Sequence, residues 1–496
     1  MVIRSIIGCI LGLLLAVPVS VFSQSTVDKK KEYLTDILQI NVAQKFRENT
    51  RRTTWQDSTW TDWLKRSGEL PPDFSVMPHI PFLPEPLVQV ENGKETIIRS
   101  KKDWAERREW IKKEYQRWIS GTTPPPPGDF KVSILSDKLE SGIRIQLIQL
   151  NFGPGGKAKM TLELMIPEGT GPFPVYMTQW THRGWAQLAV RRGYIACVYA
   201  AADSKDDTEA YQMLYPEFDF SMLMRRAWGA SRVVDYLMTL NNVNKKQIAI
   251  TGHSRNGKQS LWAAAFDERI TAVISTSSST GGDSPWRFGD PQYASETLDL
   301  VTAYNSHWFH PRLRFFFGRE DQLPVDQNLL GALIAPRALL YHYSIVERGL
   351  NPWAIEQNYY SVKKVYDFFN AADNIGVYTR YGEHAVAARD IEYAIDFLDV
   401  QFKRRDLVWQ NNLYYQYDYQ AWEKEHSKEK ADAANINPVY LKDSYESIQS
   451  FDTDKKQIVD NLQWILGNAP SGVKPTQIAD AVPGRRDWLS QVVDLP

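Results

Sequence analysis

The sequence predicts an α/β fold in which a mostly parallel β-sheet is covered by helices on both faces. Between residues 129 and 405, short apolar runs typical of buried strands alternate with segments of helical periodicity. The strand candidates are 142–151, 158–167, 175–179, 194–202, 247–251, 271–276, 338–344 and 375–381, and the main helix candidates are 222–240, 257–266, 355–369 and 391–402. Strands that alternate with helices favour a parallel sheet with helices on both faces.

Composition and charge are those of an ordinary globular protein. The chain has 496 residues, of which 43% are hydrophobic and 24% charged, and its 58 basic and 59 acidic side chains leave a formal net charge of −1. Such a balance offers no basic surface typical of nucleic-acid binding. Beyond the N-terminus there is no apolar run of about 18 residues, which excludes a polytopic membrane protein. We therefore expect neither a nucleic-acid partner nor a membrane span in the mature chain.

The first 23 residues have the pattern of a secretory signal peptide. A basic start precedes an apolar core of twelve residues, and Val21 and Ser23 occupy the small-residue positions before Gln24. This core is too short for a comfortable membrane span, although an uncleaved anchor is the alternative. We expect cleavage before Gln24 and a periplasmic or secreted protein. Cys197 would then be the only cysteine, so no intramolecular disulfide could form.

The rest of the chain divides into three parts by composition. Residues 24–128 form a polar, Trp-rich extension with helical patches, and it ends in the stiff connector PPPPG at 124–128. Residues 129–405 carry the α/β pattern and are predicted to form the catalytic domain. Residues 406–496 are polar and are expected to form a helical extension of unknown role.

The segment around Ser254 has the pattern of a serine nucleophile. An apolar strand leads into GHSRNG at 252–257, and a helix follows. A serine on a tight strand-to-helix turn between glycines is typical of α/β-hydrolases, where the turn exposes the hydroxyl above the sheet. The backbone amides of the helix start then face the developing oxyanion. The usual spacing is G-x-S-x-G, and here the second glycine comes one position later. A plain βα turn is the alternative, but the strand–turn–helix context favours a three-layer α/β-hydrolase with Ser254 as nucleophile.

A histidine base is expected after Ser254, since the order in this fold is serine, acid, histidine. His384 follows the strand at 375–381, and α/β sheets place reactive groups at the carboxyl ends of strands. We therefore predict His384 as the base. The other histidines after Ser254 are expected to be buried in the core, solvated or part of the cleft wall: His342, His426, His307 and His310.

The acid that orients this histidine should also come from a carboxyl strand end. Glu347 directly follows the strand at 338–344 and is the first choice. Asp290 and Glu296, which follow the strand at 271–276, are the rivals.

Several segments resemble the glucuronoyl esterases, carbohydrate esterases that cleave the ester between xylan glucuronic acid and lignin alcohols. GHSRNGK at 252–258 resembles the Ser-Arg-x-Gly-Lys signature of that family. The likeness spans about 130 to 403 in similar order and spacing, through STGG at 279–282, SETLDLVTAYNSHWF at 295–309, LPVDQNLLGALIAPR at 323–337 and GEHAV at 382–386. The approach from WxxRRxxI to the proline run is similar to the bacterial members. The resemblance implies an α/β-hydrolase fold and a serine esterase activity.

The resemblance also implies roles for individual residues. Ser254 matches the nucleophile and His384 the base, while Arg255 matches an arginine that stabilises the oxyanion. A guanidinium there would supply charged donors where negative charge develops. The substrate contacts that the resemblance implies are Lys258, Glu296 and Trp308.

Two positions depart from the family pattern. Many members carry the catalytic glutamate where this chain has Ser277, and others take the acid from the later strand end, where Glu347 lies. Glu347 is thus supported by both topology and alignment. The tryptophan that usually follows the late acid is replaced by Arg348, and Trp353 is the nearest tryptophan.

The sequence as a whole predicts an exported serine esterase that acts on plant cell-wall polysaccharide through a Ser-His-Glu acyl-enzyme mechanism. The predicted substrates are glucuronoyl esters, and an acetyl- or feruloyl-type xylan esterase on the same fold is the alternative. A non-catalytic glycan-binding protein is a third hypothesis, because the 17 tryptophans offer flat faces for sugars. No metal or other cofactor is expected, since the chain has neither a His-Glu-x-x-His motif nor a Cys/His cluster.

Overall fold

The computed structural model describes most of the chain between residues 26 and 413. The described ranges are 26–39, 58–91, 94–128, 130–289 and 295–413, followed by the short stretches 424, 455–456, 459–460, 476–480 and 491–494. The predicted signal peptide and its cleavage site lie outside the described residues, as do His426 and Asp290. None of the described helices is long and apolar enough to cross a membrane.

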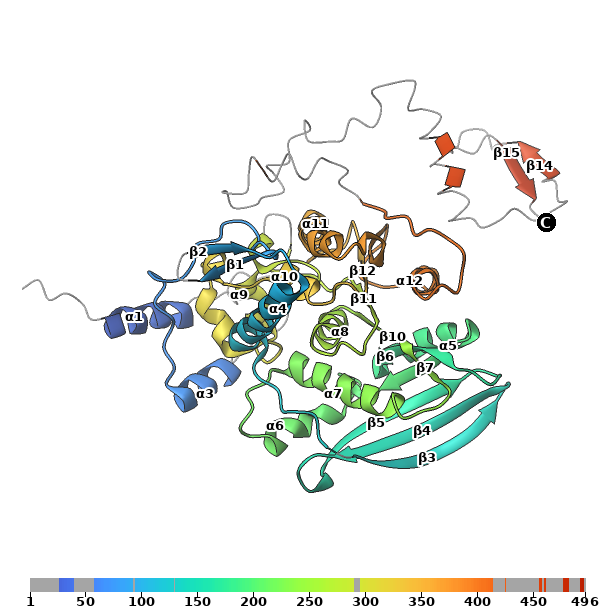
Figure 1. The fold of residues 1–496 in the computed structure, drawn as a ribbon, viewed down its shortest axis with the longest axis horizontal. Coiled ribbons are helices and arrows are strands. Elements are labelled where there is room, and N and C mark those ends of the chain that lie inside the picture. Colours follow the sequence, from blue (N-terminus) through green and yellow to red (C-terminus); the bar gives the residue numbers. More distant parts are fainter. Residues whose placement is uncertain are drawn as a thin grey trace, which may run out of the picture.

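A nine-stranded sheet organises the fold, with the order β13-β12-β11-β10-β6-β7-β5-β4-β3 (Figure 1). The strands are β3 (Phe130–Glu140), β4 (Ile143–Phe152), β5 (Ala158–Ile166), β6 (Phe173–Gln179), β7 (Ile195–Tyr199), β10 (Val243–His253), β11 (Ala272–Thr276), β12 (Ala338–Ser344) and β13 (Ile375–Arg380). Neighbouring strands from β13 to β7 are parallel. Strands β5, β4 and β3 continue the sheet in antiparallel fashion. The prediction of a mostly parallel sheet is confirmed.

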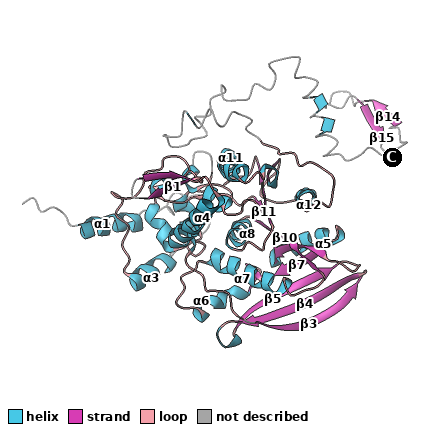
Figure 2. Ribbon diagram, in the orientation of Figure 1, coloured by secondary structure: helices cyan, strands magenta, loops and turns pink. Residues whose placement is uncertain are grey.

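Helices cover both faces of this sheet (Figure 2). They are α5 (Arg183–Arg191), α6 (Tyr211–Leu214), α7 (Met222–Leu237), α8 (Arg255–Phe266), α9 (Leu298–Tyr304), α10 (Gln327–Ala332), α11 (Pro352–Phe368) and α12 (Ala388–Gln401). Adjacent residues of β11 separate the two faces: Val273 packs in the cluster that includes α7, α8, α10 and α11, whereas Ile274 packs with α5 and α12. The central strands β6, β7 and β11 are buried nearly throughout because both of their faces are covered.

Strand β3 is the element that the sequence patterning misses. It pairs only with β4, and nearly all of its residues are exposed. Its first five residues, FKVSI, alternate apolar and polar, but the remaining LSDKLE does not, so the alternation covers less than half of the strand. A register shift between Ile134 and Ser136 interrupts the pairing further.

The N-terminal extension contains the expected helical patches together with a small hairpin. Its elements are α1 (Thr26–Gln39), α3 (Ser58–Ser67), β1 (Val88–Glu91), β2 (Lys94–Ile97), α4 (Lys101–Tyr115) and a π-helical turn at Gln116–Ser120. Ser100 and Asp103 form a capping box that starts α4. Trp104, Ile111 and Tyr115 of this helix are buried in the same core cluster as α7 and α8. The extension therefore shares its hydrophobic core with the catalytic domain.

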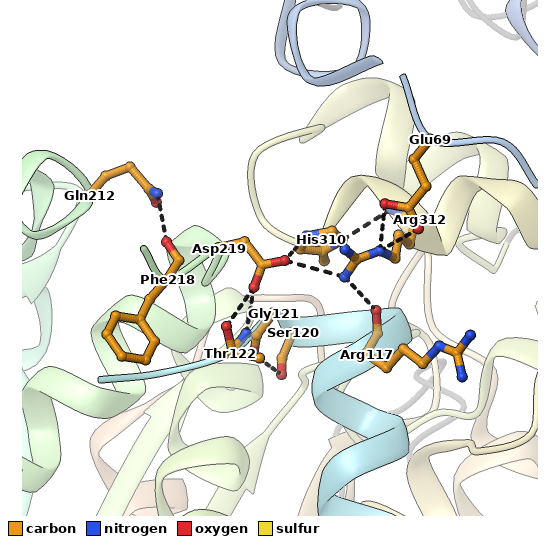
Figure 3. Close-up of polar contacts among 10 residues, drawn as sticks. All are labelled: Glu69, Arg117, Ser120, Gly121, Thr122, Gln212, Phe218, Asp219, His310 and Arg312. Carbon is orange, nitrogen blue, oxygen red and sulfur yellow. Dashed lines mark hydrogen bonds and ion pairs between the residues drawn. The ribbon is translucent and has the colours of Figure 1, made fainter. Parts of the chain in front are cut away.

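A polar junction holds the end of this extension in place (Figure 3). Asp219 accepts hydrogen bonds of 2.8 Å from both the backbone N–H and the hydroxyl of Thr122, and one of 3.0 Å from His310 Nε2. Arg312 donates to Asp219 at 3.2 Å and to Glu69 at 2.7 Å. The junction thus connects the extension with the loop before α7 and with the segment after α9. His310, expected as a wall residue, is buried in this junction.

The described residues of the C-terminal part include both helical and strand positions, with 424, 455–456 and 459–460 helical. Asn412 extends the edge of β13, since its N–H donates to Val377 O at 3.0 Å and its carbonyl accepts from Thr379 N at 3.2 Å. Further along, β14 (Thr476–Asp480) and β15 (Gln491–Asp494) form an antiparallel pair. The sequences TQIAD and QVVD are rich in β-branched residues, which favour strands over helices.

Candidate active site

Ser254 lies on a sharp turn between β10 and α8. The strand ends at His253, the helix begins at Arg255, and Ser254 itself has φ 59° and ψ −131°. Residues other than glycine are strained at such positive φ values, and this strain is typical of the nucleophile elbow. The Ser254 N–H donates to Thr276 O on β11 at 2.9 Å, which fixes the turn against the sheet. The predicted strand–turn–helix geometry is present.

The two glycines around Ser254 are required by close backbone approach. A Cβ at Gly252 would lie 2.1 Å from Asn256 O, and one at Gly257 would lie 2.9 Å from Ser278 Cβ. Gly257 is thus the position where the first turn of α8 meets the loop after β11. This contact explains why the second glycine is one residue later than in the usual spacing.

His384 and Glu347 meet above the carboxyl ends of β13 and β12. His384 Nδ1 lies 2.5 Å from Glu347 Oε1. Because an ionised carboxylate can only accept, Nδ1 carries the hydrogen, and Nε2 keeps a lone pair that can take up a proton. The Glu347 side chain is 4% exposed, whereas that of His384 is 53% exposed. The arrangement pairs a buried carboxylate with an imidazole that is half exposed.

His384 is held beside the Ser254 turn by a hydrogen bond to its main-chain carbonyl oxygen. His253, which precedes Ser254, donates from Nε2 to the carbonyl oxygen of His384 at 2.7 Å. The two imidazole rings lie 4.2 Å apart between centroids. Arg380 Nη2 donates to Glu383 O at 2.9 Å and lies 3.4 Å from His384 O. The sequence-predicted residues Ser254, His384 and Glu347 are therefore brought together.

Arg255, directly after the nucleophile, is positioned by an acid and an aromatic ring. Its guanidinium forms an ion pair with Asp203 and lies 5.4 Å from the ring centroid of Trp308. Asp203 also accepts from Arg226 Nη2 at 2.9 Å. The Arg255 side chain is 39% exposed, so part of the guanidinium can face a bound substrate. A cation at this place can stabilise an oxyanion next to Ser254.

The residues expected to contact substrate form one cluster beside Arg255. Lys258 Nζ lies 6.0 Å from the ring centroid of Trp308 and 3.4 Å from Glu296 Oε2. Lys258 is only 2% exposed, and its ammonium also donates to Ser278 O. Glu296, with 30% of its side chain exposed, is more accessible. Glu296 is paired with Lys258, whereas Glu347 is the carboxylate that contacts His384.

Comparisons with known proteins connect this site to one family. A family model described as glucuronyl esterase, fungi, matches residues 152–370. The 4-O-methyl-glucuronoyl methylesterase of Cerrena unicolor is 28% identical over 319 residues, covering 62% of this chain and 66% of that protein. A carbohydrate esterase from an unknown prokaryotic organism is 26% identical over 395 residues, covering 64% of this chain and 89% of that protein. These matches support the glucuronoyl esterase family for this chain. That family is one of carboxylic ester hydrolases.

The fold is also that of structurally characterised glucuronoyl esterase relatives. A promiscuous CE15 esterase from a marine bacterial metagenome superposes with a TM-score of 0.58 at 23% identity, over 66% of this chain and 99% of that protein. The predicted α/β-hydrolase sandwich is therefore confirmed, with the strained turn of Ser254 between β10 and α8.

Two positions distinguish this site from the pattern expected of a glucuronoyl esterase. Ser277 occupies the position where many members carry the catalytic glutamate, so this position has no carboxylate. Ser277 has φ 46°, and its hydroxyl lies 3.4 Å from Arg380 Nη2. Arg348, next to Glu347, is exposed. Trp353 is fully buried and packs 5.1 Å from Phe288, so it does not replace the aromatic residue that Arg348 displaces.

Sequence reasoning missed three residues of the site: His253, Arg380 and Asp203. Each lies at the carboxyl end of a predicted strand, which is the signal used to select His384 and Glu347. His253 precedes Ser254, whereas the chain order of this fold places the base after the nucleophile. Among the described residues, no group of three or more histidine, cysteine, aspartate or glutamate side chains could hold a metal ion.

Proposed function

We propose that this glucuronoyl esterase family member is a serine carbohydrate esterase that hydrolyses glucuronoyl esters. The observation that carries the proposal is the 2.5 Å hydrogen bond between His384 Nδ1 and Glu347 Oε1, held beside the strained turn of Ser254. The relative from Cerrena unicolor is a 4-O-methyl-glucuronoyl methylesterase, which supports an ester of a glucuronic acid as the substrate.

The proposed acylation step uses Ser254, His384, Glu347 and Arg255. His384 Nε2 takes the proton of Ser254 Oγ as this oxygen attacks the ester carbonyl. Arg255 and the backbone amides at the start of α8 stabilise the negative charge on the carbonyl oxygen. Glu347 stabilises the imidazolium of His384, which then protonates the leaving alcohol.

Deacylation repeats these roles with water in place of the serine hydroxyl. His384 removes a proton from water, the resulting hydroxide attacks the acyl-enzyme, and Ser254 leaves with the proton held by His384. The products are a free glucuronate and the restored enzyme. Arg255, which is not neutralised completely by the shared Asp203, then faces a carboxylate product.

We place the natural ester in plant cell wall, between glucuronic acid of xylan and an alcohol of lignin. Trp308, Glu296 and Arg255 combine an aromatic ring, an acceptor and a donor on one side of Ser254, a set that suits a sugar acid. The signal-peptide pattern of the first 23 residues supports export to the periplasm or beyond, where such polymers are met.

The test is an ester-hydrolysis assay on the purified mature protein and on Ser254→Ala. We expect the wild type to release benzyl alcohol from benzyl glucuronate at neutral pH, and the variant to release none above background. Turnover by the variant at the wild-type rate would refute the serine mechanism.

The same assay separates the alternative functions. Activity on acetyl or feruloyl esters without activity on glucuronate esters would favour the alternative xylan esterase, consistent with the exposed Arg348 in place of a tryptophan. Binding of xylan oligosaccharides without turnover of any ester would favour a glycan-binding protein.

A further inference from the structure

We propose that His253 is a positioning residue that holds the catalytic His384 through its main-chain carbonyl. The proposal rests on the serine mechanism proposed above and concerns a residue that has no part in proton transfer. His253 is the last residue of β10 and is bonded covalently to Ser254. Its Nε2 lies 2.7 Å from His384 O, across 131 residues of sequence. The nucleophile and the base are thus connected by one peptide bond and one hydrogen bond.

The direction of this hydrogen bond is determined by its acceptor. A carbonyl oxygen can only accept, so Nε2 of His253 must carry the hydrogen. Burial lowers the pKa of His253 to about 3, and the neighbouring charge of His384 lowers it as well. His253 is therefore neutral at working pH and holds a single tautomer. A neutral ring beside His384 also adds no repulsion when His384 becomes an imidazolium.

Packing on the other side keeps the His253 ring in this orientation. The ring of Trp185 lies 6.2 Å from it and that of His182 lies 6.1 Å from it. His182 stacks on Trp185 at 4.1 Å, and its Nε2 lies 3.1 Å from Asn256 Nδ2 in the first turn of α8. Burial lowers the pKa of His182 to about 4, so this neighbour is neutral too. His253 is thus confined between an aromatic pair and the base.

The segment that carries His384 depends on such side-chain contacts. Residues 381–387, between β13 and α12, belong to no helix or strand. The described side chains that donate to carbonyls of this segment are Ser344 to Gly382, Arg380 to Glu383 and His384, and His253 to His384. At His384 itself, the 2.7 Å contact of His253 is shorter than the 3.4 Å contact of Arg380. Loss of the His253 donor should therefore displace the base relative to Ser254.

Two substitutions separate the donor from the volume of the side chain. Gln carries an Nε2 donor at a similar reach, whereas Leu fills space without one. We expect His253→Leu to lower kcat on methyl glucuronate about 10- to 100-fold with KM within about twofold, since small misplacements of a catalytic group cost this much. We expect His253→Gln to retain most of the wild-type kcat.

A second measurement makes the test independent of the natural substrate. A fluorophosphonate probe reacts with base-activated serines, and its labelling rate can be compared among wild type, Ser254→Ala and the two His253 variants. An unlabelled wild type would refute the proposed serine mechanism. If the wild type is labelled and His253→Leu is labelled at the same rate, only the positioning role is refuted. Equal losses in His253→Leu and His253→Gln would also refute it, because the donor would then be irrelevant.

His342 provides the control for a merely structural effect. It is a fully buried histidine on β12, and burial lowers its pKa to about 3. Its ring contacts Thr276 rather than the 381–387 segment. We expect His342→Leu to lower Tm without the selective loss of kcat. If His253→Leu loses activity only in proportion to unfolded protein, as measured by Tm and circular dichroism, the positioning role is refuted.

Discussion

Single residues of the site combine backbone strain with side-chain polarity. Ser254 adopts φ 59°, where a Cβ is unfavourable, and yet this conformation exposes the hydroxyl at the start of α8. Glu347 is buried with only one of its carboxylate oxygens hydrogen-bonded among the described residues, so its charge acts mainly on His384. Reactivity in this site thus depends on groups that cost stability.

Replacing Ser254 by glycine should reveal this strain. Glycine adopts positive φ without the Cβ penalty, so we expect Ser254→Gly to be more stable than Ser254→Ala by about 1 kcal/mol. Both variants lack the nucleophile and should be inactive. Urea unfolding of the two variants measures the difference. An alanine variant at least as stable as the glycine variant would show that the turn stores no strain.

Replacing Glu347 by glutamine should remove the charge that stabilises the imidazolium. By analogy with the loss of the acid in serine–histidine–acid triads, we expect kcat to fall by about 10³-fold in Glu347→Gln. Glu296→Gln, a carboxylate on the substrate side, is the comparison and should act mainly on KM. A Glu347→Gln variant that keeps more than about a tenth of the wild-type kcat would assign the acid role elsewhere, with Asp290 as the remaining candidate.

Elements far apart in sequence meet at a few polar junctions. The Asp219 junction connects the end of the N-terminal extension, the loop before α7 and the segment after α9. Burial raises the pKa of Asp219, but hydrogen bonds from His310 and Thr122 outweigh this and hold it well below its usual value. The ionised carboxylate is therefore the form that the folded protein stabilises.

This pKa shift predicts a pH-dependent contribution of Asp219 to stability. Because the folded-state pKa is below the unfolded one, the contribution is complete above about pH 4 and is lost as the pH falls towards the folded pKa. The carboxylate is about a third exposed, so solvent screening limits the effect to about 1 kcal/mol. Asp219→Asn should lower the free energy of unfolding at pH 7 and lower it by less at pH 3.

Denaturant unfolding at the two pH values tests this, with Asp137→Asn as the control. Asp137 also has a lowered pKa, caused first by its hydrogen bond with Arg144, but it lies on the exposed strand β3. We expect a smaller effect from it. A pH-independent difference between wild type and Asp219→Asn would contradict the assigned role.

At the scale of the whole molecule, the N-terminal extension and the catalytic domain form one hydrophobic core. Tyr115 of α4 packs 5.4 Å from Trp262 of α8, the helix that follows the nucleophile, and donates to Gln327 of α10 at 2.9 Å. Removing the extension would expose this apolar surface to water.

A chain that begins at residue 130 is therefore expected to fail to fold as a soluble monomer. Its yield and its near-ultraviolet circular dichroism, compared with those of a chain that begins at Gln24, are the measurements. A stable and active protein without the extension would show that the core of the catalytic domain is complete by itself.

The sequence by itself determined the succession of strands and helices along the chain, the turn at Ser254, and the pairing of Glu347 with His384. These features are local: periodicity marks each strand, glycines mark the turn, and carboxyl ends of parallel strands converge at one edge. The edge strand β3 is exposed along nearly all of its length, and the alternation of apolar and polar residues covers only its first five positions.

Only the tertiary structure decided which side chains meet across that edge. Sequence patterns show that His253, Asp203 and Lys258 lie near strand ends, but not that they contact His384, Arg255 and Glu296. Along the chain, 38 residues separate Lys258 from Glu296, and 131 residues separate His253 from His384. Their contacts depend on strand order and on how loops pack above the sheet. Periodicity records whether a residue is buried and not which distant residue buries it.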